Sequence, residues 1–441
     1  MLPRLAARLE RLAMPPRPSL SGRVLRYDGL IAECAGFAAS PGTRCSVETE
    51  DGSLVSGEIV GFAHNRNLLL LDTPGARVVT NCVVHRMPDG GEVDVGPALL
   101  GRVIDADGCP LDGGPPPLVT ERRSLSSRAL NPMQRQPVAT PLDCGVRIIN
   151  AGLTLGRGQR MGIIAGSGVG KSVLIEMITS YTEADVVVVG LIGERAREVG
   201  EFVSRVMAGP AKARTCVVAV PADRSPLLRL RAAQRMTAIA EYFRETGKDV
   251  LLIMDSLTRV AHARREIGLA LGEQPTSKGY PPSVISMIPA LLERAGPGLP
   301  GQGTITALYT VLADGDDTTN DPVVDAARAI LDGHIVLSRK QAQMGLYPAI
   351  DLTASISRVM KDIVSPDTHA LASRLRRLIA LYVDNRDMML MGAYTPGHDP
   401  ALDEAVSAWP RIEAFAMQDT GQAVSLDESR DALVALMGTA S

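Results

Sequence analysis

Short apolar runs, broken by glycine and polar turns, dominate the chain between residues 21 and 95. Residues 22–26 and 57–62 are two of these runs, and their composition is typical of β-strands. Asp51-Gly52 stands between two such runs and is a strong signal for a hairpin turn. Several short strands within about 75 residues favour a small closed or half-closed β-barrel.

After residue 150 the pattern changes to apolar strands that alternate with helices. The expected strands span residues 159–165, 186–192, 216–220, 250–254 and 304–312, and the expected helices between them include 172–181 and 226–246. Strands that are apolar on both faces and are separated by helices indicate a parallel sheet with helices on each side. The glycine- and proline-rich residues 107–117 read as a linker that precedes this region.

Beyond residue 363 the strand signals stop. Leu371, Leu375, Leu378 and Tyr382 follow a helical period, so the last 80 or so residues are expected to be helical. The chain is therefore predicted to be an α/β protein whose parallel-sheet domain lies between a small N-terminal β-barrel and a C-terminal helical domain. The predicted divisions are residues 1–20 (helix and linker), 21–95 (barrel), 96–362 (parallel-sheet domain) and 363–441 (helical domain).

The first fourteen residues carry a separate signal, a leucine stripe. Leu2, Leu5, Leu9 and Leu12 lie on one side of a helix, which the prolines at 15, 16 and 18 would end. Two interpretations stay open: the helix packs on its own domain, or it docks on a partner helix or an acidic membrane surface.

Composition excludes several classes of function. A net charge of -3 and an aromatic content of 3% argue against nucleic-acid binding, which needs a basic surface or stacking aromatics. The six cysteines contain no C-x-x-C pair, so a disulfide framework or structural zinc site has little support. No apolar run approaches the length of a membrane helix, and a cytoplasmic location is expected.

The main chemical motif is Ala165-Gly-Ser-Gly-Val-Gly-Lys-Ser172, which follows an expected strand and opens an expected helix. In this context glycines let backbone N–H groups surround phosphate oxygens, and the helix N-terminus adds a favourable dipole. Lys171 would neutralise the β- and γ-phosphates, and the Ser172 hydroxyl would ligate Mg²⁺. Ala165 departs from the usual pattern, which has glycine there. The residues predicted to bind ATP in this phosphate loop are Gly166, Ser167, Gly168, Val169, Gly170, Lys171, Ser172 and Val173.

Two further carboxylates follow apolar strands. Asp255 ends the strand at 250–254, where such a residue holds Mg²⁺ and its waters in phosphate-loop enzymes. Glu194 follows the strand at 186–192, and a glutamate there can polarise the water that attacks the γ-phosphate. A glutamate that only stabilises a helix N-terminus is the alternative interpretation of Glu194.

Together with the phosphate loop, three segments resemble the rotary-type ATPases. These segments are Gly193-Glu-Arg-Ala-Arg-Glu198, Asp332-Gly-His-Ile-Val-Leu-Ser-Arg339 and Gly345-Leu-Tyr-Pro-Ala-Ile-Asp351. The family includes the catalytic subunits of F-type ATP synthase and the ATPases of flagellar and virulence type III secretion. Val95-Gly-Pro-Ala-Leu-Leu-Gly-Arg-Val103 and Leu291-Leu-Glu-Arg-Ala-Gly are most similar to the flagellar export ATPase. The resemblance implies a RecA-like fold for the parallel-sheet domain.

The resemblance also implies roles for five side chains. Glu194 matches the catalytic glutamate, Arg195 an arginine near the γ-phosphate, and Glu198 a second carboxylate near the metal-bound waters. Tyr347 matches a tyrosine that stacks on adenine. Arg358 matches the arginine finger that reaches the nucleotide of a neighbouring subunit.

By the same resemblance, the chain is expected to form a homohexamer that hydrolyses Mg-ATP and energises flagellar protein export. Expected partners are a stator-like regulator at the N-terminal helix, a coiled-coil central stalk at the pore loop of residues 312–318, and export substrates with their chaperones. Peripheral attachment at the inner-membrane export gate is a further expectation. The alternatives are a virulence secretion ATPase, an RNA-tracking hexameric helicase and a nucleotide-binding subunit without activity.

Overall fold

The computed structural model describes residues 20–87, 91–127, 130–312 and 321–438. The chain forms two compact units, residues 1–92 with 270–272 and residues 93–269 with 273–441, and each is described by itself. The N-terminal leucine stripe and most of the loop at 312–318 lie outside the described residues. None of the helices in the described part combines the length and apolar character needed to cross a bilayer.

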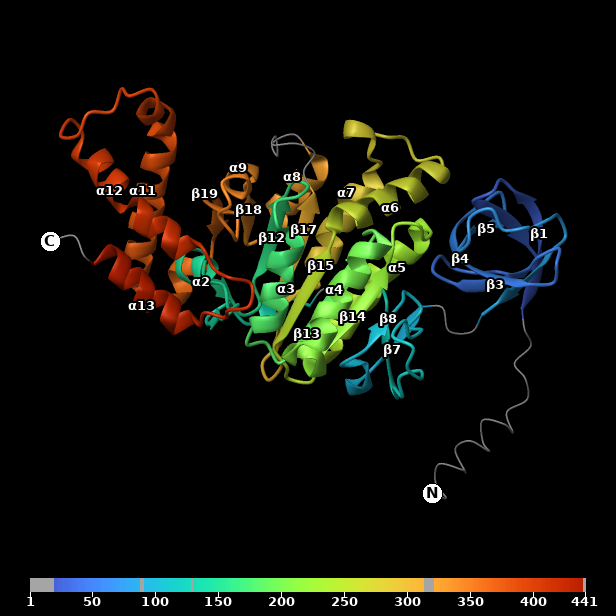
Figure 1. Ribbon diagram of the computed structural model, residues 1–441. Helices are drawn as coiled ribbons and strands as arrows, with labels where there is room; N and C mark the ends of the chain where they lie inside the picture. Colours follow the sequence, from blue (N-terminus) through green and yellow to red (C-terminus); the bar gives the residue numbers. More distant parts are fainter. Residues whose placement is uncertain (1–19, 88–90, 128–129, 313–320, 439–441) are drawn as a thin grey trace, which may run out of the picture. The chain divides into compact units, whose positions relative to one another are not determined.

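The first unit contains a closed barrel of six strands, as the sequence predicts (Figure 1). Its strands are β1 (Ser21–Tyr27), β2 (Ile31–Ala35), β3 (Arg44–Glu48), β4 (Leu54–Ala63), β5 (Arg66–Leu71) and β6 (Val83–Arg86). β3 and β4 form the hairpin predicted at Asp51-Gly52, and Gly52 has a φ of 78°. The barrel strands end at Arg86, before the boundary predicted at residue 95, because β7 (Glu92–Val95) pairs with β9 (Glu121–Ser124) instead.

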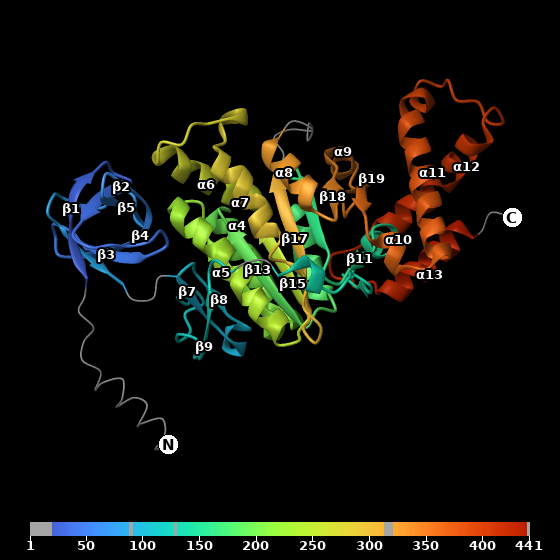
Figure 2. The same ribbon diagram turned by 180° about the vertical axis from the view of Figure 1, so that it is seen from behind.

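The second unit is built on one large sheet (Figures 1 and 2). In spatial order its strands are β19 (Ile350–Ser357), β18 (Gly333–Leu337), β12 (Arg160–Ala165), β17 (Thr304–Leu312), β15 (Val250–Asp255), β13 (Val186–Ile192), β14 (Thr215–Val220) and β8 (Val103–Ile104). β19 runs antiparallel to β18, β16 (Gly296–Pro297) runs antiparallel to β17, and the other neighbours are parallel. β10 (Pro141–Leu142) and β11 (Leu155–Gly156) form a separate pair.

Helices cover both faces of this sheet, in agreement with its fully buried central strands. The helices are α2 (Arg147–Gly152), α3 (Lys171–Tyr181), α4 (Ala196–Ala208), α5 (Pro226–Glu245), α6 (Leu257–Ala270), α7 (Pro282–Leu292), α8 (Pro322–Ile330), α9 (Arg339–Gln343), α10 (Met360–Ile363), α11 (Pro366–Leu390), α12 (Pro400–Ala416) and α13 (Leu426–Met437). α5 to α8 pack in one apolar cluster on one face, and α2, α3, α4 and the helices after α10 pack in the other. Short 3₁₀ turns occur at η1 (Pro97–Leu99), η2 (Pro132–Gln134), η3 (Pro210–Arg214) and η4 (Ser277–Gly279).

Candidate active site

The predicted phosphate loop joins β12 to α3. Its backbone depends on glycine, because Gly168 has a φ of 77° and Gly170 a φ of 88°, which side-chain-bearing residues rarely adopt. Ala165 is the last residue of β12, it is buried, and its φ is not positive. Alanine at this position therefore carries no backbone penalty, and the departure from the usual glycine pattern leaves the loop intact.

Sheet topology brings the two predicted carboxylates to this loop. β12, β15 and β13 are parallel, so their carboxyl ends lie at one edge of the sheet, with β17 between β12 and β15. Lys171 Nζ donates to Asp255 Oδ1 at 2.5 Å and to Glu194 Oε1 at 3.3 Å. The strand-end carboxylates and the loop lysine thus form one cluster, as the hypothesis from the sequence requires.

Burial and mutual charge set the electrostatics of this cluster. Burial raises the pKa of Glu194, the Asp255 charge raises it further, and Lys171 opposes both effects. For Lys171, burial lowers the pKa, but the two carboxylates more than offset this and the net pKa is raised. Thr310 Oγ1 donates to the same Asp255 oxygen at 2.7 Å, which fixes the carboxylate at the strand end. Lys171 therefore remains a cation that phosphate oxygens can engage.

Two arginines at this site were not predicted from the sequence. Arg259 of α6 lies against Gly193: a Cβ added to Gly193 would be 2.8 Å from Arg259 Cβ. Its positive charge lowers the pKa of Glu194, and its Nε is buried without a hydrogen-bond partner among the described residues. Arg339 has a terminal nitrogen 3.3 Å from the position that a Cβ on Gly166 would occupy. A buried guanidinium nitrogen without a partner among the described residues, close to Glu194, fits a site that receives an anion.

The remaining predicted residues lie at different distances from the loop. The Tyr347 ring would be 3.3 Å from a Cβ on Gly170, so this tyrosine lies against the start of α3 and is partly exposed. Arg195 has an 85% exposed side chain and forms an ion pair with Glu198 at 3.4 Å. Both are at the N-terminal end of α4, and neither contacts the Lys171 cluster in the described structure. Their predicted roles near phosphate and metal stay predictions.

Arg358 lies at the other edge of the sheet. β18 ends beside the phosphate loop, with Leu337 paired to Ala165, and β19 runs back from there to Ser357, which pairs with Gly333. Four residue steps of β18 place Arg358 about 13 Å or more from the loop edge along the strand direction. The Arg358 side chain is exposed and does not reach the loop of its own chain.

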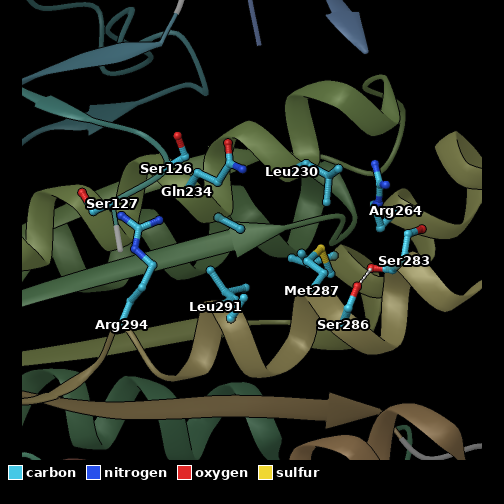
Figure 3. Close-up of a pocket in the computed structure, with 13 residues that line it drawn as sticks. Ser126, Ser127, Leu230, Gln234, Arg264, Ser283, Ser286, Met287, Leu291 and Arg294 are labelled. Atoms are coloured by element: carbon cyan, nitrogen blue, oxygen red, sulfur yellow. Dashed lines mark hydrogen bonds between the residues drawn. The ribbon is translucent and has the colours of Figure 1, made fainter. Parts of the chain in front are cut away.

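A second surface feature is a groove of about 450 Å³ on the face covered by α5, α6 and α7 (Figure 3). Leu230, Met287 and Leu291 line its apolar part, and Gln234 and Arg264 are among its polar lining residues. No residue of the phosphate loop and neither strand-end carboxylate lines this groove. The catalytic cluster, and not the groove, is therefore the candidate active site.

A strand–glycine loop–helix unit, two carboxylates at neighbouring strand ends and a sheet with this strand order define a RecA-like P-loop ATPase. Residues 145–357 match the nucleotide-binding domain model of the ATP synthase alpha/beta family, and residues 364–435 match the model of the T3SS EscN ATPase C-terminal domain.

Curated relatives place the chain more narrowly. The flagellum-specific ATP synthase of Salmonella typhimurium is 50% identical, with 96% of this chain and 95% of the relative covered. The flagellum-specific ATP synthase of Bacillus subtilis is 45% identical over 95% of both chains, and the type 3 secretion system ATPase of Xanthomonas euvesicatoria is 45% identical over 94% and 93%. The assembled ATPase EscN of enteropathogenic E. coli superimposes with a TM-score of 0.88 at 39% identity, with 94% of this chain and all of EscN covered. The chain belongs to the family of flagellum-specific ATP synthases and type III secretion ATPases.

Proposed function

We propose that this ATPase assembles into a homohexameric ring, hydrolyses Mg-ATP at its subunit interfaces, and energises protein export by the flagellar type III secretion apparatus. The observation that carries the proposal is the Lys171–Glu194–Asp255 cluster at the phosphate loop, with Arg358 at the opposite edge of the same sheet. In a ring of identical copies, the Arg358 edge of one copy can lie against the phosphate-loop edge of the next. EscN, which the chain resembles, has been solved in an assembled form.

Each site would then combine groups from two copies. The loop amides and Lys171 bind the ATP phosphates, and Glu194 accepts a proton from the attacking water as it polarises it. Arg358 of the neighbouring copy stabilises the charge that develops on the transferred phosphoryl group. Tyr347, whose ring lies next to Gly170, would stack on the adenine ring.

The residues present also fit a magnesium ion. The Ser172 hydroxyl and the Asp255 carboxylate are oxygen donors of the kind that Mg²⁺ prefers, and both lie at the loop that holds the phosphates. Bound Mg²⁺ would neutralise charge on the β- and γ-phosphates. Glu198, which pairs with Arg195 at the start of α4, would contribute only through metal-bound water.

Replacing Glu194 tests the catalytic assignment. Glu194→Gln keeps the size and hydrogen-bonding reach of the side chain but removes the base, so turnover should fall by about 10²- to 10⁴-fold while ATP binding persists. The measurement pairs ATP binding by calorimetry with phosphate release. Glu201→Gln is the matched control, because Glu201 lies on α4 and pairs with the exposed Arg197. Substantial residual turnover in Glu194→Gln would refute the role of this residue.

The sequence identities support the flagellar assignment over the virulence alternative. The flagellum-specific relatives from Salmonella and Pseudomonas aeruginosa are 50% and 48% identical, whereas the Xanthomonas secretion ATPase is 45% and EscN 39% identical. Expression of this chain in a bacterium that lacks its own flagellar export ATPase should restore export of filament protein. Restoration of effector secretion in a virulence-ATPase mutant, without restored motility in the flagellar mutant, would favour the alternative.

The proposed partners follow from the same family. EscN has been solved in complex with its central stalk EscO, and the chain superimposes on that EscN with a TM-score of 0.86. We therefore propose that a coiled-coil stalk contacts the pore loop at 312–318. A stator-like regulator would bind the leucine stripe, chaperoned substrates would dock on the ring, and the ring would work at the cytoplasmic side of the export gate. Turnover stimulated by RNA would instead favour a helicase.

A further inference from the structure

A cavity of about 490 Å³ opens beside Arg358, at the sheet edge opposite the phosphate loop. Three structural elements contribute basic side chains to it: Arg358 follows β19, Lys361 belongs to α10, and His369 and Arg376 belong to α11. None of the described residues that line the cavity is an aspartate or glutamate. Its volume is in the range of pockets that hold small ligands.

The positive charge in this cavity is not neutralised by the rest of the described chain. Arg376 is half-buried, and within the described residues its guanidinium donates one hydrogen bond, from Nη2 to the Gly152 carbonyl at 3.4 Å. No ion pair connects Arg376, Arg358 or Lys361 to a carboxylate among the described residues. Burial lowers the pKa of Arg376, as expected for a cation that loses water without gaining an anionic partner.

Such an arrangement is unfavourable until an anion arrives. A guanidinium has five N–H donors, and within the described residues Arg376 uses one of them. A tetrahedral oxyanion satisfies several donors at once and supplies the missing negative charge. Two other arginines of the described chain that lose water on folding have carboxylate partners: Arg294 pairs with Glu241 and Arg160 with Asp332.

We propose that Arg358, Lys361 and Arg376 form one binding site for a phosphoryl oxyanion, to which Arg376 contributes the half-buried guanidinium. The oxyanion is either the terminal phosphate of ATP held by the neighbouring copy or free phosphate. The first source rests on the proposed function, since it requires a ring with composite sites. The second requires only the cavity.

One experiment measures whether the site exists. The wild-type chain at a dilution where it is unassembled is melted in phosphate and in chloride of equal ionic strength, without nucleotide. Phosphate should raise the Tm of wild type and of Arg377→Gln, a matched control on an exposed arginine of α11 that does not line the cavity. Arg376→Gln should weaken the phosphate affinity about tenfold or more, the scale of one lost charge-assisted hydrogen bond. Equal phosphate dependence in Arg376→Gln and wild type overturns the proposal.

A second arm separates the two sources. If the neighbour's ATP is the ligand, Arg376→Gln lowers kcat with little change in KM. Mixing it with Lys171→Ala then restores turnover, because the intact phosphate loop of an Arg376→Gln chain can meet the intact cavity of a Lys171→Ala chain. If free phosphate is the ligand, Arg376→Gln keeps full turnover or the mixture stays inactive, while the phosphate effect on the Tm of Arg376→Gln falls to what the phosphate loop alone provides. Arg376→Lys should retain part of the phosphate effect, which separates charge from packing. Absence of turnover in wild type and Arg377→Gln would count against the proposed function. The melting result would still show whether the cavity binds phosphate.

Discussion

At the scale of single residues, the proposed role of Glu194 as general base makes activity depend on its protonation. A general base acts only when ionised, so its contribution is present above its pKa and is lost as the pH falls through it. Burial and Asp255 raise this pKa, whereas Lys171 and Arg259 lower it. The acidic limb of the pH profile should therefore lie above the range of an ordinary glutamate.

Removing Arg259 should move that limb further. In Arg259→Gln one of the charges that favour the ionised carboxylate is lost, so the acidic limb of kcat/KM is expected to shift to higher pH. The ionisation of ATP itself is common to both proteins, and the difference between the two profiles isolates the protein group. A limb that stays in place, or moves to lower pH, would show that Arg259 does not act on Glu194.

Several site residues could be predicted from the sequence because their positions depend on local structure. Asp255 and Glu194 lie at or just after a strand end, Lys171 opens the helix that follows the phosphate loop, and parallel strands bring these ends to one edge. Arg259 and Arg339 could not be predicted in this way, because their places depend on how α6 and α9 pack against Gly193 and Gly166.

The consequence of Asn150 is likewise visible only in three dimensions. Asn150 is buried, its amide nitrogen donates to Asp143 Oδ1 at 2.8 Å and to the Val424 carbonyl at 3.1 Å, and its oxygen accepts from Cys144 N. An aspartate at 150 would bring a second carboxylate against Asp143 in place of the amide that donates to it. Through these hydrogen bonds, Asn150 connects α2 and Asp143 to Val424 in the segment before α13.

At the scale of elements, close approach between β13 and α5 holds the Glu194 strand in place. A Cβ on Gly190 would lie 2.1 Å from the sulfur of Met236. Gly190→Ala should therefore destabilise the protein by about 1–3 kcal/mol through overpacking, measured as a lower Tm. Gly200→Ala in α4 meets no atom within 4 Å and should be neutral or stabilising.

A double variant tests whether overpacking against Met236 causes this destabilisation. Trimming the clashing side chain in Gly190→Ala/Met236→Ala should make the two changes non-additive, because the methyl group then enters the space that Met236 occupied. Strictly additive losses would show that the glycine is needed for another reason.

The elements that the sequence did not reveal share a physical cause. β8 has only two residues and lies next to the linker pattern, so it carries no periodic signal of its own. β19 is an antiparallel edge strand with three exposed positions, and its polar content hides it among loops. The long buried strands were predicted within a residue or two, because burial on both faces leaves an unmistakable apolar run.

At the scale of the whole molecule, the proposed function divides the catalytic site into two halves, which each chain carries at opposite edges of one sheet. The phosphate loop and Glu194 lie at the carboxyl ends of the parallel strands, and Arg358 lies at the other end of β19. Within one chain, Arg358 does not reach the phosphate loop, so the two halves cannot form one site. Activity should therefore belong to the interface between copies, and a pair of variants that each lack one half should complement one another.

The most direct test mixes Glu194→Gln with Arg358→Ala, after each has been shown to be nearly inactive alone and able to assemble. In mixed rings some interfaces combine the intact loop side of an Arg358→Ala chain with the intact arginine of a Glu194→Gln chain. Phosphate release should then rise clearly above the sum of the two separate variants. Turnover no greater than that sum, in mixtures shown to contain both chains in one ring, would contradict composite sites.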